Sequence, residues 1–165
     1  MARRILALVA GATLLWLAFE AALPWFLSPL ARLRLQLAEA CEAHAERRAD
    51  PILELVAPGW RDVPTGATRS DLARALWWSF DEGRRAGPSA ARRIHRVPPE
   101  SVELLEADAP TPARARFEVQ AWLVRPEAEE LEWRAALEAD LIEDGFRWRF
   151  ERTRWQAIEG RVRWW

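Results

Sequence analysis

The chain lacks three residue types altogether and has very little of a fourth. It contains no tyrosine, no lysine and no asparagine, and Cys41 is its only cysteine. A single cysteine cannot form a disulfide within the chain, so a disulfide framework is excluded. The cysteine content therefore does not indicate whether the protein works in an oxidising or a reducing compartment. All 24 basic residues are arginines, which we interpret as the codon bias of a GC-rich genome.

The chain also has no excess of charge of either sign. A formal net charge of −1 gives no long-range field of the kind that attracts nucleic acid. Arginine and tryptophan alternate over residues 147–165, a composition that suits stacking on single-stranded nucleic acid. In a strand, however, the same alternation places rings on one side and guanidinium groups on the other, so we expect no nucleic-acid partner. Glycine-rich phosphate loops and the G-x-S-x-G motif are missing as well.

The one long apolar run lies at the N-terminus. Residues 5–19 carry no charge, and the apolar character resumes after Glu20. Because a helix needs about 20 apolar residues to cross a bilayer, we predict an uncleaved membrane anchor over residues 1–29. A cleaved signal peptide is the first alternative, although Phe19 and Glu20 stand where a cleavage site needs small residues. A buried soluble helix is the second.

Arginines flank the apolar run on both sides, so the positive-inside rule does not fix its orientation. We favour a cytoplasmic N-terminus because a very short charged tail is costly to translocate. This orientation places the remaining domain, residues 30–165, on the periplasmic side of a bacterial inner membrane. Glu20 is an ionisable group within the predicted span, and such a group usually has a partner.

Residues 30–85 have the periodicity of helices. The apolar stripe of the first helix consists of Leu30, Leu33, Leu37, Cys41 and His44. Asp50 and Pro51 indicate the start of a second helix, which Pro58 and Gly59 end. A third helix begins at a cap formed by Thr68 or Ser70. Its apolar positions are Leu72, Leu76, Trp77 and Phe80.

The second half of the chain changes to period two, which predicts strands. A short strand is expected over residues 101–107, and long strands over 115–125 and 131–141. A final strand follows and runs toward residue 164. Helices followed by antiparallel strands indicate an α+β domain in which the apolar face of the sheet packs on the helices.

Asp144 and Gly145 predict a two-residue hairpin turn between the last two strands. This turn would pair Leu141 with Trp148 and Ala139 with Phe150, and it would set Asp140 opposite Arg149. The apolar residues then change from even to odd positions. A β-bulge near residues 152–154 would absorb this change.

Two stretches resemble a known family. Residues 49–80 (ADPILELVAPGWRDVPTGATRSDLARALWWSF) look like the early part of nuclear transport factor 2-like domains, and residues 136–158 (ALEADLIEDGFRWRFERTRWQAI) are similar to their closing hairpin. The resemblance implies a curved antiparallel sheet that forms a cone with the helices, often with a pocket inside. The aromatic residues expected to line that cone are Phe117, Trp133, Trp148, Phe150 and Trp155.

The resemblance implies no particular activity, because this fold is shared by enzymes, binding modules and assembly factors. Its enzymes, such as ketosteroid isomerases and scytalone dehydratase, use tyrosine, histidine and aspartate in the cone, whereas this chain has no tyrosine. His95 is surrounded in sequence by arginines, which should lower its pKa. Cys41 and His44 share a helix face, but two ligands without a second pair do not predict a metal site. We expect no catalytic, cofactor or metal-binding residues, although His44 or Asp140 could serve in proton transfer.

Several tryptophans exceed what one core can bury. Trp77 and Trp78 are adjacent in a helix and point about 100° apart, and surplus aromatic surface near a membrane favours a protein interface. We predict a non-catalytic, membrane-tethered binding or assembly subunit whose partners are the lipid bilayer and a membrane-complex protein. The alternative is a cone-pocket protein that binds a small apolar ligand, an isomerase- or dehydratase-like enzyme included. The candidate partner contacts are Glu20, Trp77, Trp78, Trp164 and Trp165.

Overall fold

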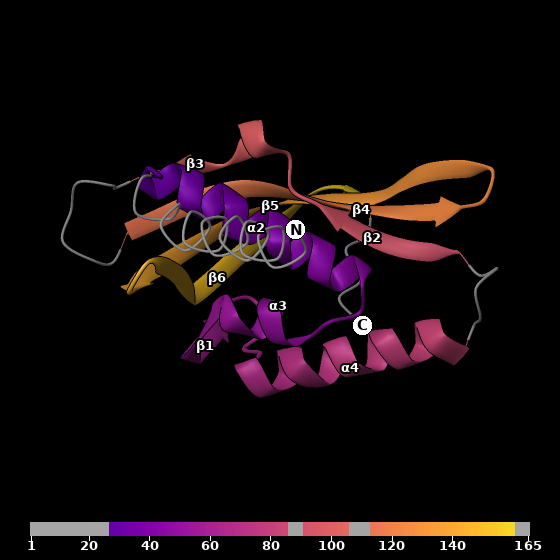
Figure 1. Ribbon diagram of the computed structural model, residues 1–165, viewed down its shortest axis with the longest axis horizontal. Coiled ribbons are helices and arrows are strands. Elements are labelled where there is room, and N and C mark those ends of the chain that lie inside the picture. Colours follow the sequence, from indigo (N-terminus) through magenta and orange to yellow (C-terminus); the bar gives the residue numbers. More distant parts are fainter. Residues whose placement is uncertain (1–26, 86–90, 106–112, 161–165) are drawn as a thin grey trace, which may run out of the picture.

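The computed structural model describes residues 27–85, 91–105 and 113–160 (Figure 1). The helices in these residues are α2 (Pro29–Ala45), α3 (Asp50–Glu54), α4 (Arg69–Arg85) and a short 3₁₀ helix, η1 (Pro99–Ser101). The strands are β1 (Val56–Asp62), β2 (Arg92–Arg96), β3 (Glu103–Leu104), β4 (Ala113–Arg125), β5 (Ala128–Asp144) and β6 (Arg147–Gly160).

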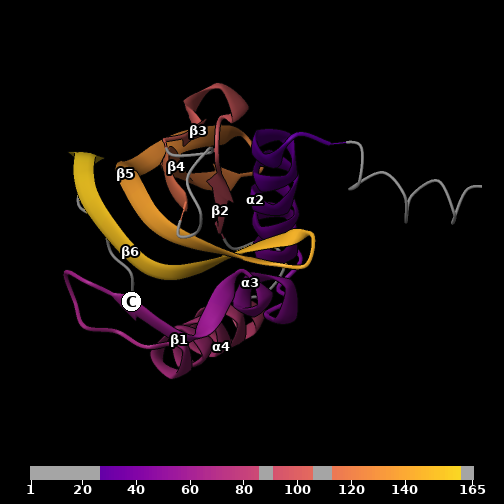
Figure 2. The same ribbon diagram turned by 90° about the vertical axis from the view of Figure 1, so that its left-hand side faces the viewer.

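The strands form one sheet in the order β1-β6-β5-β4-β2, with β3 paired to β4. Neighbouring strands are antiparallel except for β1 and β6, which are parallel. Figure 2 shows the sheet curled around an interior, with α2 along its open side and α3 and α4 below. The predicted α+β class with helices on a curled, mostly antiparallel sheet is therefore confirmed.

The first helix follows its predicted apolar stripe. Ser28 caps α2 by accepting a hydrogen bond from the backbone N–H of Ala31 at 3.2 Å, and Pro29 occupies the first turn, where a missing N–H costs nothing. Leu33 and Leu37 are buried and pack against the long strands. The stripe is thus the face that α2 packs against the sheet.

The cap of α4 is Thr68 and not Ser70. The Thr68 backbone N–H donates to Asp71 Oδ2 at 3.0 Å, and the Asp71 backbone N–H donates back to Thr68 Oγ1 at 3.4 Å. This reciprocal pair satisfies two of the free donors at the helix start. The helix buries Leu76 and Phe80.

The two edge strands of the sheet, β1 and β2, were not predicted from the sequence. A helix from Asp50 was expected to continue to Pro58 and Gly59, but it ends at Glu54, and residues 56–62 form β1 with Pro58 and Gly59 inside the strand. An edge strand tolerates proline because only one of its sides needs ladder hydrogen bonds, and the register of β1 is indeed irregular between Val56 and Arg61. At the other edge, β2 (RRIHR) has no apolar alternation to reveal it. The expected strand over residues 101–107 is reduced to β3, and residues 106 and 107 lie outside the described part.

The predicted hairpin exists, but its predicted register is wrong by two residues. Asp144 pairs with Arg147, so the loop residues are Gly145 and Phe146, and Leu141 lies opposite Phe150. Gly145 has φ 65°, a conformation in which glycine avoids the steric penalty of other residues. A shift of two leaves every side chain on its predicted face, because the strand period is two.

The bulge that restores the apolar phase lies just before the predicted segment 152–154. Leu141 pairs with Phe150 whereas Asp140 pairs with Arg152, so Glu151 is the extra residue. Beyond it, Thr153 turns inward opposite Ala139. Because of the bulge, the polar side chain of Thr153 lies in the interior of the cone.

Within the described stretches, no helix is both long and apolar enough to span a membrane. The predicted anchor over residues 1–29 lies outside these stretches as far as residue 26. Glu20, Trp164 and Trp165 lie outside them as well.

Candidate functional site

An apolar chamber of about 180 Å³ lies between β1, the start of α4 and the inner face of β6. Its wall is almost entirely apolar. The residues that line it are Ile52, Leu55, Val56, Trp60, Asp62, Thr65, Ala67, Leu72, Leu137, Phe150, Thr153 and Trp155. Small-molecule sites are typically of this kind, with apolar walls and few polar groups.

A buried carboxylate, Asp62, interrupts this apolar wall. Its side chain accepts four hydrogen bonds: Thr153 Oγ1 donates to Oδ1 at 3.1 Å, and three donors converge on Oδ2. These three are the Thr65 backbone N–H at 3.2 Å, Thr65 Oγ1 at 2.5 Å and Trp155 Nε1 at 3.4 Å. A buried carboxylate needs such donors to offset its lost hydration. Through these hydrogen bonds Asp62, on β1, is linked to the following turn and to β6 at one end of the chamber.

This arrangement limits what Asp62 can do chemically. A general base must present a free lone pair to the proton that it abstracts. Three donors already converge on Oδ2, so only Oδ1, which accepts a single bond from Thr153, keeps an open acceptor site. Asp62 was not predicted as a site residue because the strand that buries it was not predicted. The Asp62-x-x-Thr65 spacing, typical of a side chain that closes its own turn, is the signal that could have revealed it.

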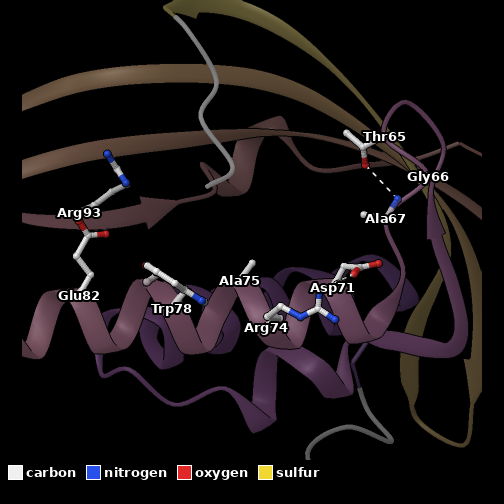
Figure 3. Close-up of a pocket in the computed structure, with 10 residues that line it drawn as sticks. Thr65, Gly66, Ala67, Asp71, Arg74, Ala75, Trp78, Glu82 and Arg93 are labelled. Carbon is white, nitrogen blue, oxygen red and sulfur yellow. Dashed lines mark hydrogen bonds and ion pairs between the residues drawn. The ribbon is translucent and has the colours of Figure 1, made fainter.

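An open groove of about 590 Å³ adjoins the chamber (Figure 3). Thr65 and Ala67 line both cavities. The groove runs along α4, and its lining residues are Thr65, Gly66, Ala67, Asp71, Arg74, Ala75, Trp78, Ser79, Glu82 and Arg93. The groove therefore combines an aromatic ring and small apolar side chains with charges of both signs.

Arg93 is fixed at one end of this groove. Its guanidinium donates to both carboxylate oxygens of Glu132, at 2.6 and 2.8 Å. These hydrogen bonds, opposed by partial burial and assisted by the charges of Glu132 and Glu82, raise the pKa of Arg93. Figure 3 shows Glu82 and Arg93 at one end of the groove and Asp71 and Arg74 at the other. The groove thus has charged ends and an apolar middle.

The two adjacent tryptophans of α4 are both exposed. Trp77 is 58% exposed and Trp78 65%, while Leu76 and Phe80 supply the buried face of the helix. Trp77 shares the helical spacing of Leu72, Leu76 and Phe80, but it does not lie on the buried face of α4. Trp78 lines the groove, so one ring of the pair belongs to a cavity and the other lies on open surface.

The sequence matches no protein-family model and no curated protein. Among solved structures, an NTF2-like protein with a cystatin-like fold from Novosphingobium aromaticivorans is similar, with a TM-score of 0.59 and 14% identity over 93% of this chain and 90% of that chain. The β subunit of benzoate 1,2-dioxygenase from Burkholderia mallei has a TM-score of 0.60 and 13% identity over 76% and 87% of the two chains. Aln2 from a Streptomyces species has a TM-score of 0.61 and 12% identity over 79% and 93%.

The domain has the nuclear transport factor 2-like fold. The resemblance that the sequence suggested is thus confirmed for the fold, and identities of this size carry no activity over to the chain.

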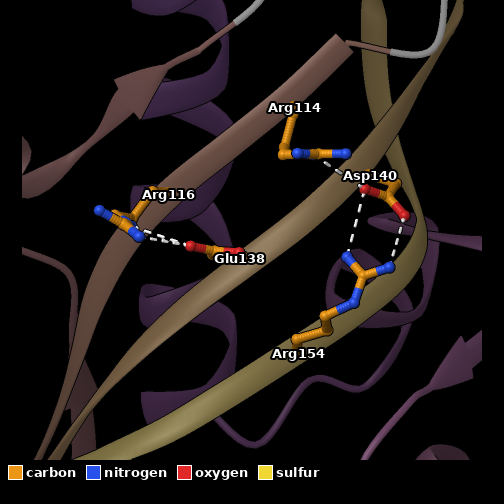
Figure 4. A network of polar contacts seen from close by, with 5 residues as sticks. All are labelled: Arg114, Arg116, Glu138, Asp140 and Arg154. Atoms are coloured by element: carbon orange, nitrogen blue, oxygen red, sulfur yellow. Dashed lines mark hydrogen bonds and ion pairs between the residues drawn. The ribbon is translucent and has the colours of Figure 1, made fainter.

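Within this fold, the five aromatic residues predicted to line the cone occupy three places. Phe150 and Trp155 line the chamber. Phe117 and Trp148 lie in the main core with α2, and Trp133 belongs to a smaller cluster with Ala121 and Ala135. Asp140, which the sequence left open for proton transfer, lies on the outer face of the sheet between Arg114 and Arg154 (Figure 4).

The two histidines meet in a cluster of rings. His44 and His95 pack edge to face with ring centroids 4.3 Å apart, His44 lies 5.4 Å from Phe80, and His95 lies 5.6 Å from Trp133. Burial, with smaller contributions from Arg93 and Arg92, lowers the pKa of His44 to about 4. Burial, followed by His44 and Arg93, lowers the pKa of His95 to about 3. The predicted direction for His95 is confirmed, although burial outweighs the arginines.

These pKa values leave little chemistry in the cluster at neutral pH. Both imidazoles are uncharged, and burial raises the pKa of the neighbouring Cys41 thiol to about 11, so the reactive thiolate is scarce. Across the three described stretches, no group of three or more His, Cys, Asp or Glu side chains could hold a metal ion. Cys41 and His44 lie on the same helix, as the sequence indicated.

Proposed function

We propose that the chain is a non-catalytic binding subunit that docks a protein partner against α4. The observation that carries this proposal is the exposure of Trp77 (58%) and Trp78 (65%) beside a groove of about 590 Å³. Tryptophan is enriched among the residues that contribute most to protein interfaces. One protein of the same fold is, by its name, the β subunit of a dioxygenase, which is compatible with a role as a subunit.

The groove suits a particular kind of partner. Its middle is formed by Ala75 and Trp78, and its ends carry Asp71, Arg74, Glu82 and Arg93. A protein segment that inserts an apolar side chain against Trp78 and carries charges of both signs around it would match this pattern. Charges at the rim contribute to specificity and association rate more than to affinity.

The chemistry of the buried groups supports a non-catalytic role. Asp62 already accepts four hydrogen bonds, and the lowered pKa values of the two histidines, about 4 and about 3, make both imidazoles weak bases. An efficient general base has a pKa near the working pH, so neither histidine is suited to that role.

We further propose that residues 1–29 tether the domain to the inner membrane, with residues 30–165 on the periplasmic side. Support comes from the uncharged run of residues 5–19 and from its length. The full chain should remain with membranes after a carbonate wash, whereas a variant without residues 1–26 should be released. Protease added to spheroplasts should digest the domain; a protected domain would contradict the orientation.

Co-purification in mild detergent tests the proposed partner. The wild-type chain should retain a stoichiometric protein partner, and the double variant Trp77→Ser/Trp78→Ser should lose it. Leu35→Ser is the matched control, since Leu35 is 42% exposed on a different helix, and it should retain the partner. A second variant, Trp164→Ala/Trp165→Ala, tests the other candidate pair. A chain that purifies with a lipid or metabolite but no protein would overturn the proposal.

A second candidate function is a cone-pocket protein that binds a small apolar ligand. The apolar chamber of about 180 Å³ favours it, because an engineered apolar cavity of about 150 Å³ stays dry and binds benzene. Organic extraction of the purified protein, followed by mass spectrometry, tests this candidate. A chamber that holds no extractable compound and binds no small apolar probe would exclude it.

A further inference from the structure

The last described strand ends beside the open groove along α4. Gly160 pairs with Trp133 on β5 and has φ 72°, a left-handed conformation that turns a chain out of a strand. A Cβ at this position would lie 2.5 Å from the backbone oxygen of Glu132. The Glu132 carboxylate in turn holds the guanidinium of Arg93 at the end of the groove. The chain therefore leaves β6 next to the Arg93 end of the groove.

That end of the groove carries a carboxylate without an ion pair. Glu132 neutralises Arg93. Arg74 lies 3.7 Å from Asp71. Glu82, in contrast, forms no hydrogen bond or ion pair with the other residues that the structure describes, and its charge acts on Arg93 from a greater distance. Figure 3 shows the Glu82 side chain pointing toward Arg93. The uncompensated charge of the groove is therefore negative and lies where the chain leaves β6.

The five residues that follow Gly160 in the sequence complement this groove. They are Arg161, Val162, Arg163, Trp164 and Trp165. All five lie outside the described part of the chain. In an extended segment, residues 161, 163 and 165 share one face, which would carry two guanidinium groups followed by an indole. The groove offers the same order, with the Glu82 carboxylate first and the Trp78 ring next.

The spacing of the two patterns agrees as well. Glu82 and Trp78 are one turn apart on α4, or about 6 Å along the helix axis. Residues 163 and 165 of an extended chain are about 7 Å apart. Five extended residues span about 17 Å, about the axial length of α4 from Glu82 to Asp71. The segment is therefore long enough to run along the groove.

We propose that residues 161–165 bind in this groove of their own chain, with Arg163 beside Glu82 and Trp165 against Trp78. The indole rings supply apolar contact, and the charge-assisted hydrogen bonds of Arg163 with Glu82 fix the position of the segment. The segment covers the surface to which the proposed partner binds, so the contact is autoinhibitory and the partner must displace it. In this last respect the inference rests on the proposed function.

Removal of the segment tests the contact. The full chain and a variant that ends at Gly160, both labelled with ¹⁵N at the tryptophan indoles and held in mild detergent, are compared by NMR. We expect the Trp78 indole N–H resonance to move when residues 161–165 are removed. Trp148 is the control, because its Nε1 donates to Pro29 O at the other end of β6, and its resonance should stay in place. A Trp78 resonance that the removal does not affect would overturn the inference.

A peptide tests the pairing of Arg163 with Glu82. The peptide Arg-Val-Arg-Trp-Trp, added to the shortened chain, should move the Trp78 resonance back toward its wild-type position and saturate. Glu82→Arg should weaken this binding about 5-fold, and a peptide with Arg163→Glu should bind that variant more tightly than the original peptide does. Glu39→Arg is the control, since Glu39 is exposed on α2 and does not line the groove. Equal losses in both variants would show general charge attraction and overturn the pairing.

Dilution separates a contact within one chain from a contact between copies. The Trp78 resonance of the full chain should not depend on protein concentration. If dilution moves it toward the position in the shortened chain, the segment of a second copy occupies the groove, and the contact within one chain is overturned.

Co-purification distinguishes this inference from the proposed function. If both hold, the chain without residues 161–165 should retain more protein partner than the wild type, whereas Trp77→Ser/Trp78→Ser should lose it. Equal retention by the full and shortened chains would overturn the autoinhibitory role. A segment that binds in the groove of a chain with no protein partner would instead overturn the proposed function and leave the contact standing.

Discussion

Burial sets the protonation of the two histidines more strongly than any single neighbouring charge does. His44 and His95 touch each other and aromatic rings, and burial is the largest cause of the lowered pKa of each. The sequence showed the arginines around His95 but could not show the rings, which come from α2, α4 and β5. The direction of the shift was therefore predictable and its main cause was not.

The histidine cluster makes stability depend on pH. The pKa of each histidine falls from 6.5 in the unfolded chain to about 4 for His44 and about 3 for His95 in the folded domain. Well above pH 6.5 both are neutral in both states, so full stability is retained. As pH falls through 6.5, both histidines become protonated in the unfolded chain but stay neutral in the folded domain. We expect the free energy of unfolding to fall by up to about 1.4 kcal/mol per pH unit for each histidine.

Urea unfolding between pH 6.5 and pH 5 measures this dependence, in a range where most exposed carboxylates stay ionised. His95→Phe keeps a ring in the cluster and removes one titrating group, so it should reduce the slope by about half. A wild-type free energy of unfolding that does not change across this range would contradict the uncharged state of both imidazoles.

At the scale of elements, the long strands were predictable and the edge strands were not. In β4 and β5 apolar and polar residues alternate over many positions, a pattern that only a half-buried strand produces. β1 contains Pro58 and Gly59, and β2 is mostly charged, so neither has a periodic pattern. Both become strands because a neighbour, β6 or β4, offers an unpaired row of backbone groups.

The hairpin between β5 and β6 gives a test at this scale. Gly145 occupies the turn with φ 65°, a region that costs other residues about 1–2 kcal/mol. Gly145→Ala should therefore lower the free energy of unfolding by about 1 kcal/mol. Gly59→Ala is the matched control, because an added Cβ there meets no atom within 4 Å, and its effect should stay within about 0.5 kcal/mol. Equal effects in thermal or urea unfolding would contradict the observed turn.

At the scale of the whole molecule, the two faces of the sheet carry different chemistry. The inner face packs on α2 and encloses the chamber. The outer face carries ion pairs between neighbouring strands, among them Arg116 with Glu138 and Asp140 with both Arg114 and Arg154 (Figure 4). Each of these three arginines thus faces a carboxylate on β5.

Asp140 is the member of this network whose loss should be measurable. Its side chain is 14% exposed, whereas those of Arg114 and Arg154 are 47% and 41% exposed. Solvent screening at the arginines limits the expected loss for Asp140→Asn to about 1 kcal/mol at low salt. This loss should shrink in 1 M NaCl, where the screening length falls to about 3 Å.

Glu130→Gln is the control for this measurement. Glu130 is 66% exposed and meets Arg125 at 3.3 Å, so its replacement should have no measurable effect on urea unfolding. An Asp140→Asn loss that does not depend on salt would show that packing, and not charge, holds this residue.

The sequence by itself determined the α+β class, the long strands, the amphipathic helix α2 and the family resemblance, because periodicity is a local property that each segment carries alone. It also singled out the exposed tryptophan pair, since adjacent helical residues cannot face one core. Only the tertiary structure decided the parallel pairing of β1 with β6, the burial of Asp62 and the contact of His44 with His95. Each of these depends on segments far apart in the chain, and no single segment contains that information.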